Sequence, residues 1–188
     1  MRLRKDQFSP GTFYHVYNHA SQGRLLFRLP EDYEFCLCLI KRFLPQDLFS
    51  LGAYCLMPNH YHILLRQLTE EPLTQAFFRI WNRYAKYYNS KYKSYGSVFC
   101  QKLQHVPIEK DQYLYQLIPY IHLNPVKAEL ADSPEAWPWS DCRFWIDQQS
   151  VEGFDSRLRD MFFNPKEYRD WLRELTEIKL QSKLLIDG

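Results

Sequence analysis

The chain has 188 residues, of which 46% are hydrophobic and 17% aromatic, a composition that suits one folded domain and excludes general disorder. The formal net charge is only +2, and no apolar run approaches the roughly 18 residues of a membrane span. Five scattered cysteines without a C-x-x-C pair favour buried thiols in a reducing compartment over a disulfide framework. We therefore expect a cytoplasmic protein that does not associate with membranes.

The first part of the chain predicts a strand, a helix and a hairpin. Residues 12–19 are β-branched and aromatic with partial alternation, which is typical of a strand. Residues 31–43 show helical spacing, and their acidic start and basic end complement the helix dipole. Residues 49–57 and 60–66 are short apolar segments separated by Pro58-Asn59, a pair typical of a tight turn.

The second part predicts a helix over 73–92, a strand over 98–108 and a helix from about Asp111 to Asn124. The resulting order of elements matches a ferredoxin-like or RRM-like α+β fold, an antiparallel sheet with helices on one face. From about residue 150 the chain is more polar and its pattern is helical. We therefore expect a main domain over 1–149 and a helical C-terminal extension over 150–188.

The segment from 72 to 108 combines six Lys or Arg residues with many aromatic residues and contains no Asp or Glu. Cations interleaved with aromatics favour binding to a phosphate backbone and unstacked bases. Arg79, Arg83 and Lys86 share one helix stripe at spacings of four and three, and are the predicted contacts with a DNA backbone. The alternative is an ordinary solvated basic face on a helix whose aromatics lie in the core.

The stretch MPNHYHILL places His60 and His62 two residues apart at the start of an apolar run. On a strand, side chains at i and i+2 point to the same face. Two imidazoles at that spacing can bind one divalent ion and leave positions open for other ligands. Histidine pairs on strands also occur as ordinary half-buried residues, so this motif alone leaves both interpretations open.

A second candidate group lies in PYIHLNPV, where Tyr120 and Asn124 share a helix face at spacing i, i+4, with Gln116 one turn earlier. Tyrosine can act as a covalent nucleophile, and an amide oxygen could give a metal its third protein ligand. Together with the two histidines this set suits phosphodiester chemistry. The alternative is a core tyrosine and an asparagine that ends a helix before Pro125.

These motifs also carry a resemblance to a known family. MPNHYH, followed by YIHLNPVKA and WPWS in the same order, resembles the HUH single-tyrosine transposases, and most closely the group associated with repetitive extragenic palindromes, the REP-associated tyrosine transposases. The similarity covers roughly residues 10 to 145. It implies that 1–149 is an HUH transposase-like catalytic domain.

The resemblance implies a role for each matched residue. His60 and His62 would be metal ligands, Asn124 would complete a site for Mg²⁺ or Mn²⁺, and Tyr120 would be the nucleophile that forms a 5′-phosphotyrosine link. The substrate would be single-stranded DNA with imperfect hairpins, and the activity a nuclease and strand-transfer reaction in DNA transposition and recombination. We expect a monomer or a homodimer.

Two departures and three alternatives accompany this interpretation. Tyr61 stands where the family usually has a bulky aliphatic residue, and we expect its ring to pack on the opposite sheet face. Pro119 precedes the proposed nucleophile and should bend its helix, which could aim Tyr120 at the metal or displace it. The alternatives are a non-catalytic nucleic-acid-binding module on the same fold, a metallohydrolase without a covalent step, and a replication-initiator or relaxase-type HUH enzyme, which the helix motif fits poorly.

Overall fold

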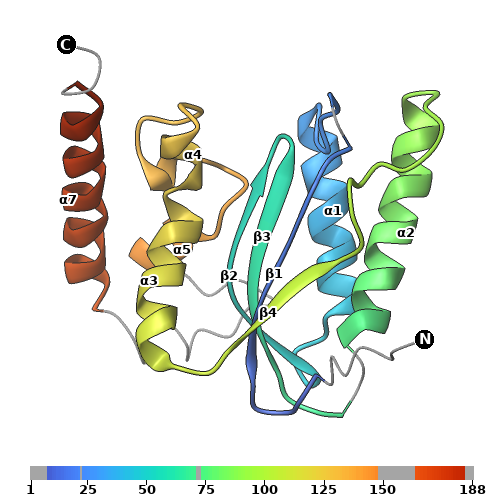
Figure 1. Ribbon diagram of the computed structural model, residues 1–188, viewed down its shortest axis with the longest axis horizontal. Helices are drawn as coiled ribbons and strands as arrows, with labels where there is room; N and C mark the ends of the chain where they lie inside the picture. The colour runs from blue at the N-terminus through green and yellow to red at the C-terminus, as the bar shows by residue number, and fades with distance from the viewer. Residues whose placement is uncertain (1–7, 22, 71–72, 148–163, 185–188) are drawn as a thin grey trace.

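The computed structural model describes residues 8–21, 23–70, 73–147 and 164–184. Four strands are interspersed with helices in the first part of the chain, and helices alone follow (Figure 1). The elements are β1 (Phe13–His19), α1 (Pro30–Phe43), β2 (Phe49–Met57), β3 (His60–Gln67), α2 (Leu73–Lys91), β4 (Gln104–Ile108), α3 (Asp111–His122), α4 (Asn124–Lys127), η1 (Pro134–Ala136), α5 (Cys142–Ile146) and α7 (Pro165–Leu184). The predicted α+β fold with an antiparallel sheet is confirmed.

The four strands form one sheet in the order β2-β3-β1-β4, and all neighbouring strands are antiparallel. Strand β1 therefore lies between β3 and β4. The register of β1 and β3 places Tyr17 opposite His62 and His19 opposite His60. Strand β4 is an edge strand, the place in a sheet where its Pro107 can be accommodated.

Helices cover both faces of the sheet (Figure 1). Helices α1 and α2 lie together on one face, as predicted, and pack on residues such as Tyr61, Ile63 and Leu65 of β3. Helix α3 packs on the opposite face with α5 and α7, against Leu64 of β3 and Ala53 of β2. Every residue of β2 is buried, and such a doubly buried strand requires cover on both sides. The prediction of helices on one face was therefore incomplete.

The α1–α2 layer is joined at one end by the carboxylate of Asp32, which is fully buried. It accepts hydrogen bonds from the backbone amides of Arg28 and Leu29 just before α1. It also accepts from Tyr87, Lys91 and Tyr92 at the end of α2. One carboxylate thus satisfies donors at the start of one helix and fixes the end of the other.

One predicted boundary differs from the structure. The strand predicted over 98–108 shortens to β4, because the chain before it makes one isolated bridge, Ala20 with Phe99, and then leaves the sheet edge. The predicted division between 149 and 150 lies outside the described residues. Helix α7 contributes Tyr168 and Leu172 to the same core cluster as α3. Among the described residues, no helix is long and apolar enough to cross a bilayer.

Candidate functional site

His60 and His62 lie on β3 and face the α3 side of the sheet. The strand's alternation explains this direction, since Tyr61 and Ile63 belong to the core under α1 and α2 while Leu64 belongs to the core under α3. Tyr61 is fully buried and stacks on Trp81 with ring centroids 4.2 Å apart, so it packs on the opposite face as predicted. The two imidazole rings themselves lie 5.1 Å apart.

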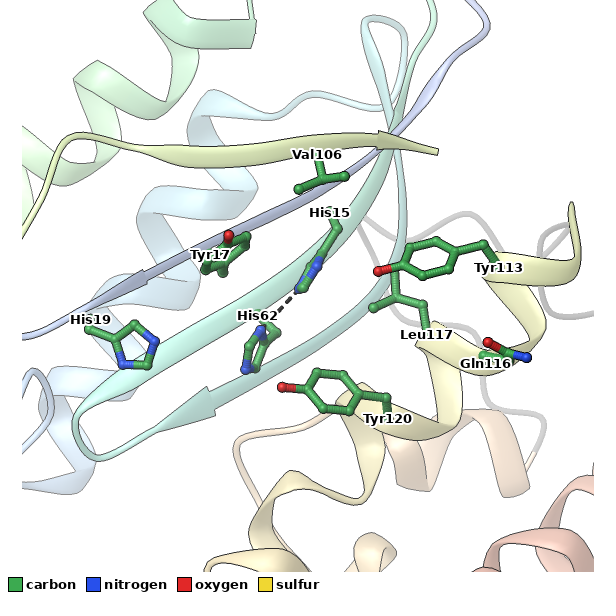
Figure 2. A pocket seen from close by; sticks show the side chains of 9 residues that line it. All are labelled: His15, Tyr17, His19, His62, Val106, Tyr113, Gln116, Leu117 and Tyr120. Carbon is green, nitrogen blue, oxygen red and sulfur yellow. Dashed lines mark hydrogen bonds between the residues drawn. The ribbon is translucent and has the colours of Figure 1, made fainter. Parts of the chain in front are cut away.

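Tyr120 comes from α3 and reaches the histidines. Its ring centroid lies 5.4 Å from that of His62, and its hydroxyl is directed toward that ring (Figure 2). The ring is 40% exposed, so it is accessible and not a core residue. Pro119 lies inside α3 and is buried, yet the helix continues through it to His122. The proline therefore does not turn Tyr120 away from the histidines.

Asn124 lies next to His60 and presents its oxygen to the site. Its amide nitrogen donates hydrogen bonds to the backbone carbonyls of Tyr120 (2.7 Å) and Ile121 (3.4 Å). The amide oxygen is therefore the atom left for the interaction of this side chain with the ring of His60. The break between α3 and α4, where Pro125 follows, places Asn124 in this position.

Neighbouring side chains influence which ring nitrogens of His60 and His62 carry a lone pair that could bind a metal ion. Nδ1 of His60 lies 2.7 Å from the amide oxygen of Asn59, which can only accept. When Nδ1 carries the proton of the neutral ring, Nε2 keeps its lone pair. Nδ1 of His62 lies 3.0 Å from Nε2 of His15 on β1. When His62 donates its Nδ1 proton to His15, its Nε2 is likewise unprotonated. Both histidines can thus present a bare Nε2.

His15, His60 and His62 are neutral at physiological pH, because the pKa of each is lowered. Burial lowers the pKa of His15 to about 4. Burial, together with repulsion from His19, lowers the pKa of His60 to about 4 against the opposing hydrogen bond with Asn124. Burial, with added repulsion from His15 and other neighbours, lowers the pKa of His62 to about 2. Neutral imidazole is the form that binds metal ions.

One cation lies directly beside the tyrosine. The ammonium of Lys127, on α4, sits 4.1 Å from the centroid of the Tyr120 ring. A cation over a phenol ring is attracted by the ring's π-electrons, which holds the ring in place. It also puts a positive charge beside Tyr120.

A pocket of about 520 Å³ opens beside the tyrosine and the histidines. Figure 2 shows side chains of β1 and β4 on its sheet side and side chains of α3 on the other. The described residues that line it are His15, Tyr17, His19, His62, Val106, Tyr113, Gln116, Leu117 and Tyr120. None of these is acidic, so the pocket does not repel an anionic ligand.

A buried polar network fixes α3 behind the site. The carboxylate of Asp141 accepts hydrogen bonds from the amide of Tyr54 on β2 (2.7 Å) and from the indole of Trp145 on α5 (2.8 Å). It also contacts Nε2 of His122 at 3.1 Å, and the other nitrogen of that ring meets the hydroxyl of Tyr168 on α7 at 2.6 Å. His122 follows Tyr120 by two residues and thus anchors the helix, which is a structural role.

The three cations predicted to contact DNA lie elsewhere. Arg79, Arg83 and Lys86 are exposed on α2, which covers the face of the sheet opposite to the histidines. The guanidinium of Arg83 lies 4.6 Å from the ring centroid of Phe43. They share one stripe, as their spacing indicated, but they do not line the pocket beside Tyr120. Their contact with DNA stays a prediction.

The donors fit a divalent ion of the kind that the resemblance implies. The bare Nε2 atoms of His60 and His62 and the amide oxygen of Asn124 make a set of two nitrogens and one oxygen. Across the described ranges, no group of three or more His, Cys, Asp or Glu side chains could hold a metal. An ion here would therefore depend on the amide and on water or phosphate oxygens, and mixed nitrogen and oxygen ligands suit Mn²⁺ better than Mg²⁺.

The structure adds site residues that the sequence did not indicate. His15 touches His62, and the ring of His19 stacks on that of His60 with centroids 5.0 Å apart. The alternation of His15, Tyr17 and His19 on β1 was visible in the sequence, and it placed them on one face. What was missing was the pairing of β1 with β3.

Comparisons with known proteins bear on the fold. No protein-family model matches the chain, and no curated protein sequence matches it. Among solved structures it is similar to a REP-associated tyrosine transposase bound to a REP hairpin, with a TM-score of 0.64 and 16% sequence identity. The similarity covers 82% of this chain and 94% of that one. The chain therefore shares the fold of that transposase.

Proposed function

We propose that the protein is a metal-dependent nuclease and strand transferase for single-stranded DNA, related to the REP-associated tyrosine transposases, that acts near DNA hairpins through a 5′-phosphotyrosine intermediate. The observation that carries this proposal is the meeting of Tyr120 from α3 with His62 from β3, at 5.4 Å between ring centroids. A nucleophile, a pair of neutral imidazoles and an amide oxygen then converge on one place. The similar transposase structure contains a bound REP hairpin, which supports the choice of DNA substrate.

The reaction is a transesterification. The phenol oxygen of Tyr120 attacks phosphorus and forms a P–O bond, the bond from phosphorus to the 3′-oxygen breaks, and the phenol's proton is passed on to that oxygen. One phosphodiester replaces another, so no ATP is needed and the reverse reaction rejoins strands. His60, His62 and Asn124 would hold Mg²⁺ or Mn²⁺, which would stabilise the charge that develops on the phosphate. Lys127 adds a positive charge beside the attacking ring.

The test is a covalent protein–DNA adduct on a denaturing gel. Purified protein is incubated with Mn²⁺ and single-stranded DNA that carries imperfect hairpins, and we expect a slower band with wild type and none with Tyr120→Phe. Tyr115→Phe is the matched control, because Tyr115 lies on the same helix and is similarly exposed (39%) but does not line the pocket.

The other outcomes separate the alternatives. Cleavage that survives in Tyr120→Phe would show a metallohydrolase without a covalent step. Hairpin binding without cleavage or adduct in wild type would show a binding module on the same fold. Either result overturns the proposed chemistry.

A further inference from the structure

The proposed reaction leaves the aromatic part of the pocket beside Tyr120 without a role. Strand transfer at phosphorus needs the tyrosine and the metal donors, yet the pocket extends away from them along β1, β4 and α3 (Figure 2). Its sheet side is formed by Tyr17 and Val106 and its helix side by Tyr113 and Leu117. We propose that this pocket binds the base of a nucleotide adjoining the phosphate that Tyr120 attacks, and so selects unpaired DNA. This inference rests on the proposed function.

The exposure of these side chains is the first argument. Tyr113 is 45% exposed and Val106 is 39% exposed, and both lie beside Tyr120, itself 40% exposed. Large apolar side chains that gather around one hollow mark a ligand site more often than a chance arrangement. The pocket's volume of about 520 Å³ lies within the range of about 300–1,000 Å³ found for small-molecule sites.

The chemistry of the lining selects the occupant. Aromatic rings offer stacking surfaces that accept any base, because every base has a π-face. The amide of Gln116, on the α3 side, can both donate and accept at the edge of a base. The side chains of Gln116 and Tyr113 form no hydrogen bond with another described residue, so these groups are available to a ligand.

Position gives the second argument. A phosphate at Tyr120 carries a nucleoside on each side, so one base must lie within a sugar's length of the attacking oxygen. Tyr120 itself lines the pocket, and residues of β1 and β4 line its sheet side. A base paired in a duplex cannot enter such a pocket without leaving its stack. The pocket therefore favours single strands over duplexes.

The experiment measures whether the pocket recognises bases. Two fluorescent DNA hairpins are compared, one with a single-stranded thymidine tail and one whose tail is entirely abasic, and dissociation constants are measured by anisotropy with Mn²⁺ present. We expect wild type to prefer the thymidine tail by about tenfold or more, since stacking contributes roughly 1–3 kcal/mol per base. Tyr113→Ala should lose most of this preference, while Tyr113→Phe and the control Tyr115→Ala should keep it. Both alanine changes are at exposed positions, and thermal unfolding verifies that the proteins fold.

The results separate this inference from the proposed reaction. A preference for the thymidine tail that is unchanged in both Tyr113→Ala and Tyr17→Ala overturns the base pocket, even if wild type forms the covalent adduct. Loss of preference in these variants, with no adduct from wild type, supports the pocket and overturns the reaction. No preference in wild type at all also overturns the pocket.

Discussion

Replacement of Asp32 by Asn should lower the free energy of unfolding at neutral pH and remove a defined part of its decline in acid. Burial alone would raise the pKa of Asp32, but hydrogen bonds from Lys91, Tyr92 and the amides of Arg28 and Leu29 outweigh it and lower the pKa from 3.8 to about 2. A difference of nearly two units corresponds to about 2.5 kcal/mol at 1.36 kcal/mol per unit. Lys91 is partly exposed, so solvent screening reduces the expected contribution to roughly 1–2 kcal/mol.

The direction of the pH effect follows from the lowered pKa. Above about pH 5 both the folded and the unfolded carboxyl are ionised, and the full stabilisation is present. As the pH falls toward 2, the unfolded chain takes up the proton first, and the stabilisation is lost. Urea unfolding of wild type at several pH values should therefore show a decline in this window, and Asp32→Asn should be less stable at pH 7 with a smaller decline.

A neighbouring carboxylate gives the matched control. Glu31 precedes Asp32 in the chain, lies 3.9 Å from Lys91 and has a side chain that is 66% exposed. Glu31→Gln should change the free energy of unfolding by less than about 1 kcal/mol, because exposed ion pairs contribute little. If Glu31→Gln and Asp32→Asn cost the same, or if the decline between pH 5 and pH 2 is the same in Asp32→Asn and wild type, the reasoning from the buried network is wrong.

Three further predictions concern the site and its support. His15→Leu should weaken Mn²⁺ binding about 10- to 100-fold by calorimetry, because the proton donor–acceptor pair that orients His62 is lost; unchanged affinity would refute that role. Asp141→Ala should lower the free energy of unfolding by about 3 kcal/mol or more in urea titrations, since it leaves buried donors on β2 and α5 unpaired, and a loss below about 1 kcal/mol would contradict the network. Replacing the three exposed α2 cations by alanine should reduce the salt dependence of DNA affinity, with a slope smaller by roughly 0.7 per lost single-strand contact; an equal slope would place the DNA elsewhere.

Much of the fold was predictable because local patterns agreed with tertiary needs. The apolar segments 49–57 and 60–66 became β2 and β3 with almost the predicted bounds. Residues 98–103 were predicted as strand because they resemble one in composition. Val98 is indeed buried in the core, but burial there comes from packing and not from a sheet ladder, and composition alone cannot distinguish these two cases.

The positions of site residues were predictable where they depend on spacing within one strand or helix. Contacts between residues of two different elements were not predictable. The side-by-side placement of His60 and His62 follows from strand geometry, and that of Tyr120 and Asn124 from helix geometry. The contact of His15 with His62 depends on the β1–β3 register, which no local pattern fixes. Lys127 was part of a recognised motif, yet its place over the Tyr120 ring depends on the break at Pro125 that starts α4.

The charge of the site determines how its ligands depend on each other. The proposed metal donors are all neutral, since burial keeps the pKa of His60 and His62 far below 7 and the third donor is an amide. Without a carboxylate, such a set attracts a divalent cation only weakly on its own. A DNA phosphate would supply the missing negative charge. In the absence of an ion, Lys127 is the one described cation in contact with the Tyr120 ring, and it can interact with that phosphate. Ion and DNA should therefore strengthen each other's binding by the same factor, as linkage requires, so that the proposed reaction centre assembles chiefly when the substrate is present.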